Sequence, residues 1–304
     1  MSAPTCRGRS RGFTLAPLIL LTVLGACAQT TARRATSVVN YLYPAGQSEP
    51  AQPSVPKLTL PLRVGIAFVP PAAGEVTPAA YVGDRDAAAP ETERFRLMET
   101  IAAHFRERPY VKSVEIIPTA YLTPGGGFTN LDQIRNMFGV DEIVLIAFDQ
   151  VQFKDQGVAT LTYWTLVGAY VVQGEKHDTR TLMDAVVLDI PSRKLLFRAP
   201  GTSVVKGRST PVNESEELRQ DRQQGFKLAT AELITALDAQ LAAFQERLKA
   251  QPEEIEVVRT PEYEKRAAAS GGGAVDAAAL AILAALAGGG AGVASWRRRR
   301  SGAR

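Results

Sequence analysis

Ile143-Val-Leu-Ile-Ala-Phe-Asp-Gln-Val-Gln-Phe153 is the first of four long strand patterns in the chain, and it indicates a fold centred on a sheet. Three further strand patterns follow it, over residues 159–172, 181–190 and 195–205. Turn signals separate these patterns, among them Asp155-Gln156-Gly157 and Pro191-Ser192-Arg193. Sequential strands with such short connections predict a four-strand antiparallel meander.

The residues before the meander predict strands that alternate with helices. Arg63 to Val69 is a nearly continuous apolar run ended by Pro70-Pro71, which fits a strand buried on both faces. Pro90-Glu91-Thr92-Glu93 opens a helix with acidic residues in its first turn. The apolar stripe expected on that helix is Phe95, Met98, Ile101, Ala102 and Phe105. A strand over 111–117 and a short helix over 131–138 follow.

The last long element is a helix over about 214–250. Its repeating apolar face is Phe226, Leu233, Leu237, Leu241, Phe244 and Leu248. The predicted order is therefore β-α-β-α-β-β-β-β-α, an α/β (α+β) fold with a mixed sheet covered by helices. At the level of pattern, this order resembles the periplasmic α/β modules of other envelope lipoproteins, such as those of curli-secretion and TolB amino-terminal type.

The N-terminus, residues 1–26, has the features of a secretory signal peptide. Arg7, Arg9 and Arg11 form a basic region, and an apolar stretch runs from Leu15 to Leu24. Leu24-Gly25-Ala26-Cys27 then resembles a bacterial lipobox. The resemblance implies cleavage between Ala26 and Cys27, with diacylglyceryl and acyl (palmitate) groups added at Cys27. An ordinary signal peptide with Cys27 at the cut by chance is the alternative.

The C-terminus, residues 274–304, predicts a transmembrane helix. An Ala/Leu/Ile run of about eighteen residues follows Ser270-Gly271-Gly272-Gly273, roughly the minimum that crosses a hydrocarbon core. Trp296 suits the membrane interface, and Arg297, Arg298, Arg299 and Arg300 favour the cytoplasmic side as a stop. The alternative is a disordered Ala/Gly-rich tail.

This tail resembles the GlyGly-CTERM sorting signal, which is the substrate tail of rhombosortases, rhomboid-type intramembrane proteases. The resemblance implies cleavage in the region of Ser270, Gly271, Gly272 and Gly273 and removal of the helix. The lipobox and this tail together resemble the rhombotarget lipoprotein family. Ala28 follows the lipobox cysteine where an Asp would retain a lipoprotein at the inner membrane, so by analogy the outer membrane is favoured.

The predicted organisation has five parts. They are a signal peptide (1–26), a Pro-rich tether (27–61), a periplasmic α/β domain (62–250), a charged and Gly-rich spacer (251–273) and the sorting tail (274–304). Within the tether, the patch from Ser37 to Tyr43 is either a strand that docks on the domain or an apolar stretch of the tether.

Charge and cysteine content exclude several classes of function. Of the 35 Lys and Arg residues, eight lie in the two terminal signals, as does one of the 31 acidic residues, so the remaining chain is mildly acidic. Nucleic-acid binding therefore loses its main support. Cys6 lies in the signal peptide, so Cys27 alone remains, which excludes an internal disulfide and a thiolate metal site.

Candidate catalytic groups are few. His104 is expected on a helix surface or helix end, and His177 at a solvated hairpin tip. Several carboxylates flank the strand patterns: Asp141, Glu142, Asp149, Asp155, Asp184 and Asp189. If Asp149 and Asp184 met across the sheet, they would support acid–base chemistry. Otherwise such residues are solvated charges that prevent a strand edge from pairing with another chain.

The aromatic residues Tyr163, Trp164 and Tyr170 fall in one strand pattern, over 159–172, and favour either core packing or a partner-binding face. The sequence as a whole favours a non-enzymatic binding or assembly module without a cofactor. Its expected partners are membrane lipid through Cys27, a rhombosortase and an unidentified envelope protein. We expect the protein at the periplasmic or cell surface, with its C-terminal helix transiently in the inner membrane. The alternatives are an envelope hydrolase using carboxylates and a tether anchored in both membranes.

Overall fold

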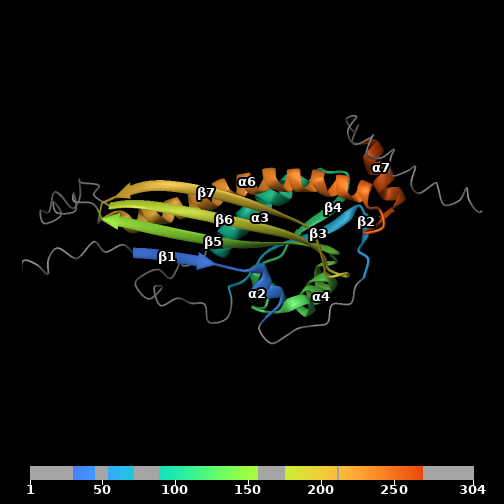
Figure 1. Ribbon diagram of the computed structural model, residues 1–304, viewed down its shortest axis with the longest axis horizontal. Coiled ribbons are helices and arrows are strands. Elements are labelled where there is room, and N and C mark those ends of the chain that lie inside the picture. The colour runs from blue at the N-terminus through green and yellow to red at the C-terminus, as the bar shows by residue number, and fades with distance from the viewer. Residues whose placement is uncertain (1–29, 45–53, 72–88, 157–174, 211, 270–304) are drawn as a thin grey trace, which may run out of the picture.

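The computed structural model describes residues 30–44, 54–71, 89–156, 175–210 and 212–269. A six-stranded mixed sheet forms its centre, with strand order β4-β3-β5-β6-β7 and β1 paired to β5 (Figure 1). These strands are β1 (Thr30–Ala35), β3 (Leu62–Phe68), β4 (Val111–Ile116), β5 (Glu142–Gln156), β6 (Glu175–Asp189) and β7 (Lys194–Ser209). A separate parallel pair joins β2 (Lys57–Leu60) to β8 (Glu256–Arg259).

Helices cover both faces of the sheet. They are α2 (Val38–Leu42), α3 (Glu91–Arg106), α4 (Gly127–Phe138), α6 (Glu214–Ala250) and α7 (Pro261–Ala269), with a 3-10 turn, η3 (Thr119–Tyr121). The connection through α3 leads outward from β3 to β4, and the connection through α4 leads back past β3 to β5. Because parallel crossovers are right-handed, two crossovers in opposite directions place their helices on opposite faces.

Strand β5 connects the two parts of the sheet, because its full length pairs with β6 on one side. On its other side it pairs first with β3, from Glu142 to Ile146, and then with β1, from Asp149 to Lys154. The gap between β3 and β1 is closed by backbone bonds from Val69 to Ile146 and from Thr36 to Phe148. The long strand is therefore hydrogen-bonded on both edges.

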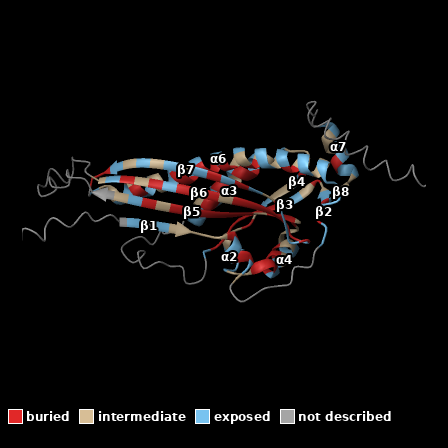
Figure 2. Ribbon diagram, in the orientation of Figure 1, coloured by how far each residue is buried: buried red, intermediate tan, exposed pale blue. Residues whose placement is uncertain are grey.

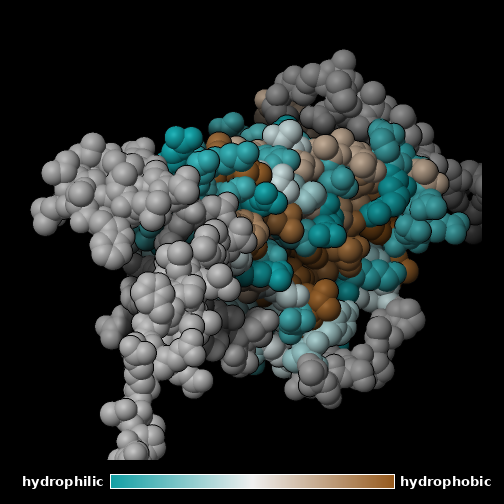
Figure 3. All heavy atoms as spheres, turned by 60° about the vertical axis from the view of Figure 1, so that its left-hand side comes forward, coloured by the Kyte–Doolittle hydropathy of each residue, from teal (hydrophilic) through white to brown (hydrophobic). Residues whose placement is uncertain are grey.

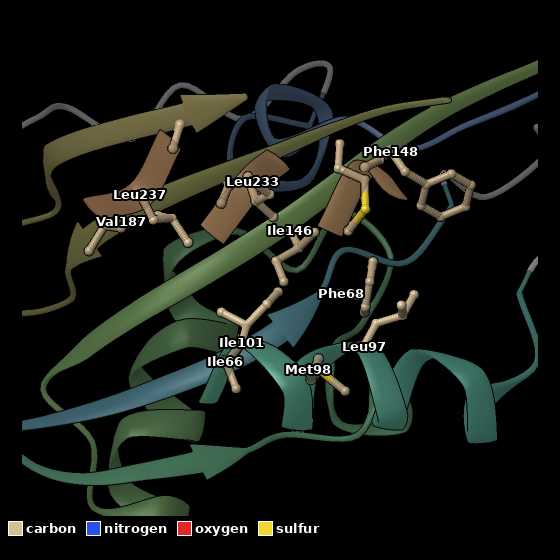
Figure 4. Packing of buried hydrophobic residues seen from close by; sticks show 14 of the residues in the cluster. Ile66, Phe68, Leu97, Met98, Ile101, Ile146, Phe148, Val187, Leu233 and Leu237 are labelled. Atoms are coloured by element: carbon tan, nitrogen blue, oxygen red, sulfur yellow. The ribbon is translucent and has the colours of Figure 1, made fainter. Parts of the chain in front are cut away.

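Two hydrophobic cores lie against the sheet, one on each face (Figure 2). The first packs β3, β5, β6 and β7 against α3 and α6, with Phe68, Met98, Ile146 and Leu233 at its centre (Figure 4). The second packs the other face against α2 and α4. Full burial of one such side chain stabilises the fold by about 1.5–3 kcal/mol.

Helix α6 follows the sheet for its whole length, and its contacts change along the way. Its second half packs by apolar side chains, whereas its first half is also bonded through its backbone carbonyls. Gln152 donates to the Leu218 carbonyl at 3.1 Å, Gln150 to the Arg222 carbonyl at 3.2 Å and Ser203 to the Gly225 carbonyl at 2.8 Å. These bonds fix the position of α6 along the sheet.

Two glycines allow the helix to lie this close. A Cβ atom on Gly201 in β7 would come within 2.3 Å of the Ala229 carbonyl oxygen, and one on Gly225 would come within 2.6 Å of Thr181 Oγ1. Backbone thus meets backbone at Gly201, and no side chain fits between them.

Most predicted elements are confirmed. The helices expected at 131–138 and 214–250 and the strands at 63–69 and 111–117 are present with small shifts, and the fold is mixed α/β with a mixed sheet. The predicted four-strand meander is wrong in its strand order, since β5 pairs directly with β6 and the described meander is β5-β6-β7. The strand predicted over 159–172 lies outside the described residues.

The predicted tether and spacer contain ordered elements. Within 27–61, β1 extends the sheet, and Val38, Tyr41 and Leu42 of α2 are buried. The Tyr41 hydroxyl also donates to Asn130 at 2.8 Å. The strand or apolar tether patch expected at 37–43 is thus a short helix, because its apolar residues pack on α4. Within 251–273, β8 and α7 replace the expected spacer, because β8 pairs with β2.

No helix among the described residues is long and apolar enough to cross a membrane. The transmembrane helix predicted in 274–304 lies outside those residues and stays a prediction.

We predict that Gly201→Ala destabilises the protein by about 1–3 kcal/mol, because the added methyl group overlaps the α6 backbone. Urea unfolding measures the change. Val204→Ala, at an exposed position on the same strand, is the control and is expected to shift stability by about 0.5 kcal/mol or less. Equal midpoints for the two variants would contradict the close packing.

Candidate functional site

A recess of about 670 Å³ opens at the amino-terminal ends of the parallel strands. It lies between the β2–β8 pair, the beginnings of β3, β4 and β5, and the turn after β6. Its charged lining residues are Lys57, Arg63, Lys112, Arg135, Asp141, Asp189 and Glu262. Strands β3, β4 and β5 are parallel, so all three begin at this end of the sheet.

Asp141 is the central charge of this recess. Its carboxylate pairs with Arg63 of β3 at 2.6 Å and with Arg135 of α4 at 3.2 Å, so three elements meet at one side chain. At the rim, Lys112 pairs with Glu262 of α7 at 2.8 Å and Lys57 with Glu256 of β8 at 2.9 Å. The rim charges are half-exposed, so each pair contributes little to stability and stays open to exchange with a charged ligand.

Two buried carboxyl groups lie at the strand ends beside the recess, and one of them, Asp189, belongs to its lining. Glu142 and Asp189 are directly opposite each other on β5 and β6, and they are 2% and 1% exposed. Asp189 accepts a hydrogen bond from the Ser192 backbone at 2.9 Å. The Oε2 atom of Glu142 is buried and has no hydrogen-bond partner.

Burial, followed by the nearby carboxylates of Asp141 and Asp189, raises the pKa of Glu142 from 4.5 to about 8. Loss of solvation and like charges both disfavour the ionised form. Glu142 is therefore mostly protonated, and so uncharged, at neutral pH.

An apolar cavity of about 110 Å³ lies on the other side of these strand ends. Successive strand residues alternate between the two hollows: Arg63 and Asp141 line the recess, whereas Val64 and Glu142 line the cavity. Phe105 of α3 and Leu241 and Phe244 of α6 complete it. One end of the sheet thus offers a charged surface and an apolar one.

The carboxylates proposed for acid–base work are held by arginines. Asp149 pairs with Arg33 of β1 at 2.6 Å, and Asp184 pairs with Arg198 of β7 at 2.5 Å. Both lie on the face opposite α6, two rungs apart on β5 and β6, but each carboxylate is neutralised by its own guanidinium group. The side chain of Asp155 lies outside the described residues.

The two histidines differ in their surroundings. His104 lies on the surface of α3 and contacts Asp238 at 2.8 Å, in line with the surface position expected. His177 is buried in β6, and its Nδ1 contacts Asp221 of α6 at 2.7 Å. The solvated hairpin position predicted for His177 is wrong, because β6 begins at Glu175 and α6 covers this face.

The predicted processing residues all lie outside the described residues. This applies to Ala26 and Cys27, to Ser270, Gly271, Gly272 and Gly273, and to the arginines from Arg297 to Arg300. It applies equally to the aromatic residues Tyr163, Trp164 and Tyr170.

The recess itself was not predicted. Arg63 is 78 positions from Asp141 in the sequence, and only the pairing of β3 with β5 brings it to this carboxylate, which Arg135 also binds. Each charge at a strand or helix end looks ordinary by itself. Among the described residues, no group of three or more His, Cys, Asp or Glu side chains is arranged to hold a metal ion.

No protein-family model and no curated protein matches the sequence. Similar solved structures include two of the PelC dodecamer from Paraburkholderia phytofirmans, with 14% and 15% identity and a TM-score of 0.26 for each. Both matches cover 69% of this chain, with 96% and 95% of PelC. Lipoprotein GNA1162 from Neisseria meningitidis matches with 12% identity and a TM-score of 0.22, covering 53% of this chain and 96% of its own. Likeness at this level carries no functional information.

We predict that the ionisation of Glu142 by itself lowers the free energy of unfolding by a few kcal/mol as pH rises from about 4.5 to about 8. In this range the unfolded chain releases the proton that folded Glu142 retains, so ionisation favours unfolding. The variant Glu142→Gln removes this dependence and exceeds the original chain in stability most at about pH 8. Urea unfolding at several pH values measures it.

The control is Glu107→Gln at an exposed glutamate, which is expected to keep the pH dependence of the original chain. If the free energy of unfolding of Glu142→Gln changed with pH in the same way as that of the original chain, the claim that Glu142 is buried in its neutral form would be contradicted.

Proposed function

We propose that this protein is a lipid-anchored protein of the bacterial envelope whose α/β domain is a non-enzymatic binding or assembly module. The lipobox Leu24-Gly25-Ala26-Cys27 supports the anchor, and the C-terminal signal supports processing by a rhombosortase. The observation that most supports the binding role is the charged recess at the amino-terminal ends of the parallel strands.

Several surface features suit a binding or assembly module. Its volume of about 670 Å³ is that of a ligand-sized hollow. Its rim carries both signs of charge, at Lys57, Lys112 and Glu262, in pairs that a partner can exchange. Apart from the recess, the face of the molecule drawn in Figure 3 carries apolar side chains gathered in one patch with hydrophilic side chains around it. A bordered apolar patch of this kind is typical of interaction surfaces.

The hydrolase alternative has weaker support, because Asp149 and Asp184 are each paired with an arginine. In a binding module those two ion pairs fix the outer face of the sheet, and the partner enters at the recess. The tether spanning both membranes differs from the favoured proposal only in whether the C-terminal helix is retained.

We predict that the mature protein begins at lipid-modified Cys27 and ends near Gly272. Intact-mass measurement of protein purified from the envelope tests both ends. The variant Cys27→Ser is expected to lose the lipid mass and to leave the membrane fraction. A lipid-modified chain that still ends at Arg304 would favour the double-membrane tether, and an unmodified Cys27 would contradict the anchor.

We predict that reversing two rim charges, with Lys57→Glu and Lys112→Glu together, lowers partner recovery about tenfold, or about 1.4 kcal/mol. Like charges would then face Glu256 and Glu262. Cross-linking and capture from envelope extracts, quantified against the original chain, gives the recovery. Lys227→Glu on the exposed side of α6 is the control. Equal recovery for both variants would contradict the recess as the binding site.

A further inference from the structure

Strand β1 fixes where the start of the domain lies. Thr30 pairs with Lys154, and the register continues without a shift to Ala35 beside Asp149. The chain therefore enters the sheet at the far end of β5, at the left in Figure 1. Cys27 comes three residues before Thr30, so an extended chain separates them by about 10 Å at most.

The same end of the molecule gathers the ends of four other elements. Lys154 is opposite His177 in β6, and His177 is opposite Gly207 in β7. Helix α6 also begins here, because Glu214 in its first turn forms an ion pair with Lys154. A lipid on Cys27 would thus lie next to a rigid end of the sheet, which we name the anchor end: the outermost residues of β1, β5, β6 and β7.

The recess lies at the opposite end. Strand β6 runs from Glu175 at the anchor end to Asp189, which lines the recess. At about 3.3 Å per residue, these two positions are about 45 Å apart. An anchor at one end therefore holds the charged recess well away from the membrane surface.

Two basic side chains at the anchor end suit a headgroup layer. Exposed Lys176 and Arg208 lie opposite each other on the adjoining strands, where they can meet lipid phosphates.

We propose that the anchor end of the sheet faces the phospholipid bilayer, so that the long axis of the sheet points away from the membrane and presents the recess to the periplasm. This orientation rests on the proposed lipid anchor at Cys27. The bilayer is the partner of this surface, and an envelope protein is the partner of the recess.

Single labels at the two ends of the same hairpin test the orientation. Lys176→Cys lies at the anchor end and Lys194→Cys at the recess end, and both lysines are exposed. In the processed protein the introduced thiol is the only free one, because Cys6 is removed and Cys27 carries lipid. Each variant is labelled with a fluorophore and reconstituted in vesicles of phosphatidylethanolamine and phosphatidylglycerol with brominated chains.

The label at residue 176 is expected to be quenched by the brominated lipid, whereas the label at residue 194 keeps its emission. Equal emission from the two labels, or stronger quenching at residue 194, would overturn the orientation. The intact mass of the protein, which shows whether Cys27 carries lipid, distinguishes failure of the orientation from failure of the lipid anchor. Lipid-modified Cys27 with equal quenching overturns the orientation alone, and unmodified Cys27 overturns the anchor and the orientation together.

Discussion

The packing of α6 along the sheet is the interaction on which the rest of the structure depends. The helix has 37 residues, about 55 Å, and so matches the length of the long strands β5, β6 and β7. At Gly201 its backbone meets that of β7 without an intervening side chain. Its carbonyl groups also accept bonds from Gln150, Gln152 and Ser203. One helix therefore joins both ends of the molecule.

This packing explains why the two halves of the sheet differ. Near the recess, helices cover both faces, and the strand residues are apolar on both sides. Toward the anchor end, α6 covers one face, while the other face carries ion pairs and exposed residues such as Leu182 and Val204. Buried polar residues there, such as Gln152 and His177, bond to α6 and fix the helix in one position. The fold thus separates the end that carries the recess from the end at which the chain enters the sheet.

Sequence periodicity predicted the elements that carry their own signal. The helix at 214–250 matches because its apolar residues recur at helical spacing along one face. The stripe expected on α3 was partly wrong, since Phe95 is 48% exposed and Leu97 is buried instead. The predicted tether contained β1 and α2, since proline content gives no information about long-range pairing with β5. The recess could not be predicted, because Asp141 meets Arg63 only through strand order.

Amide hydrogen exchange tests the central role of α6 most directly. If the helix unites the sheet, amides in the first half of α6 and in β6 from Thr179 to Met183 should open with the same free energy as the core around Ile146 and Leu233. Markedly faster exchange of the anchor end, with full protection retained around Leu233, would mean that the two ends unfold separately and would contradict the account.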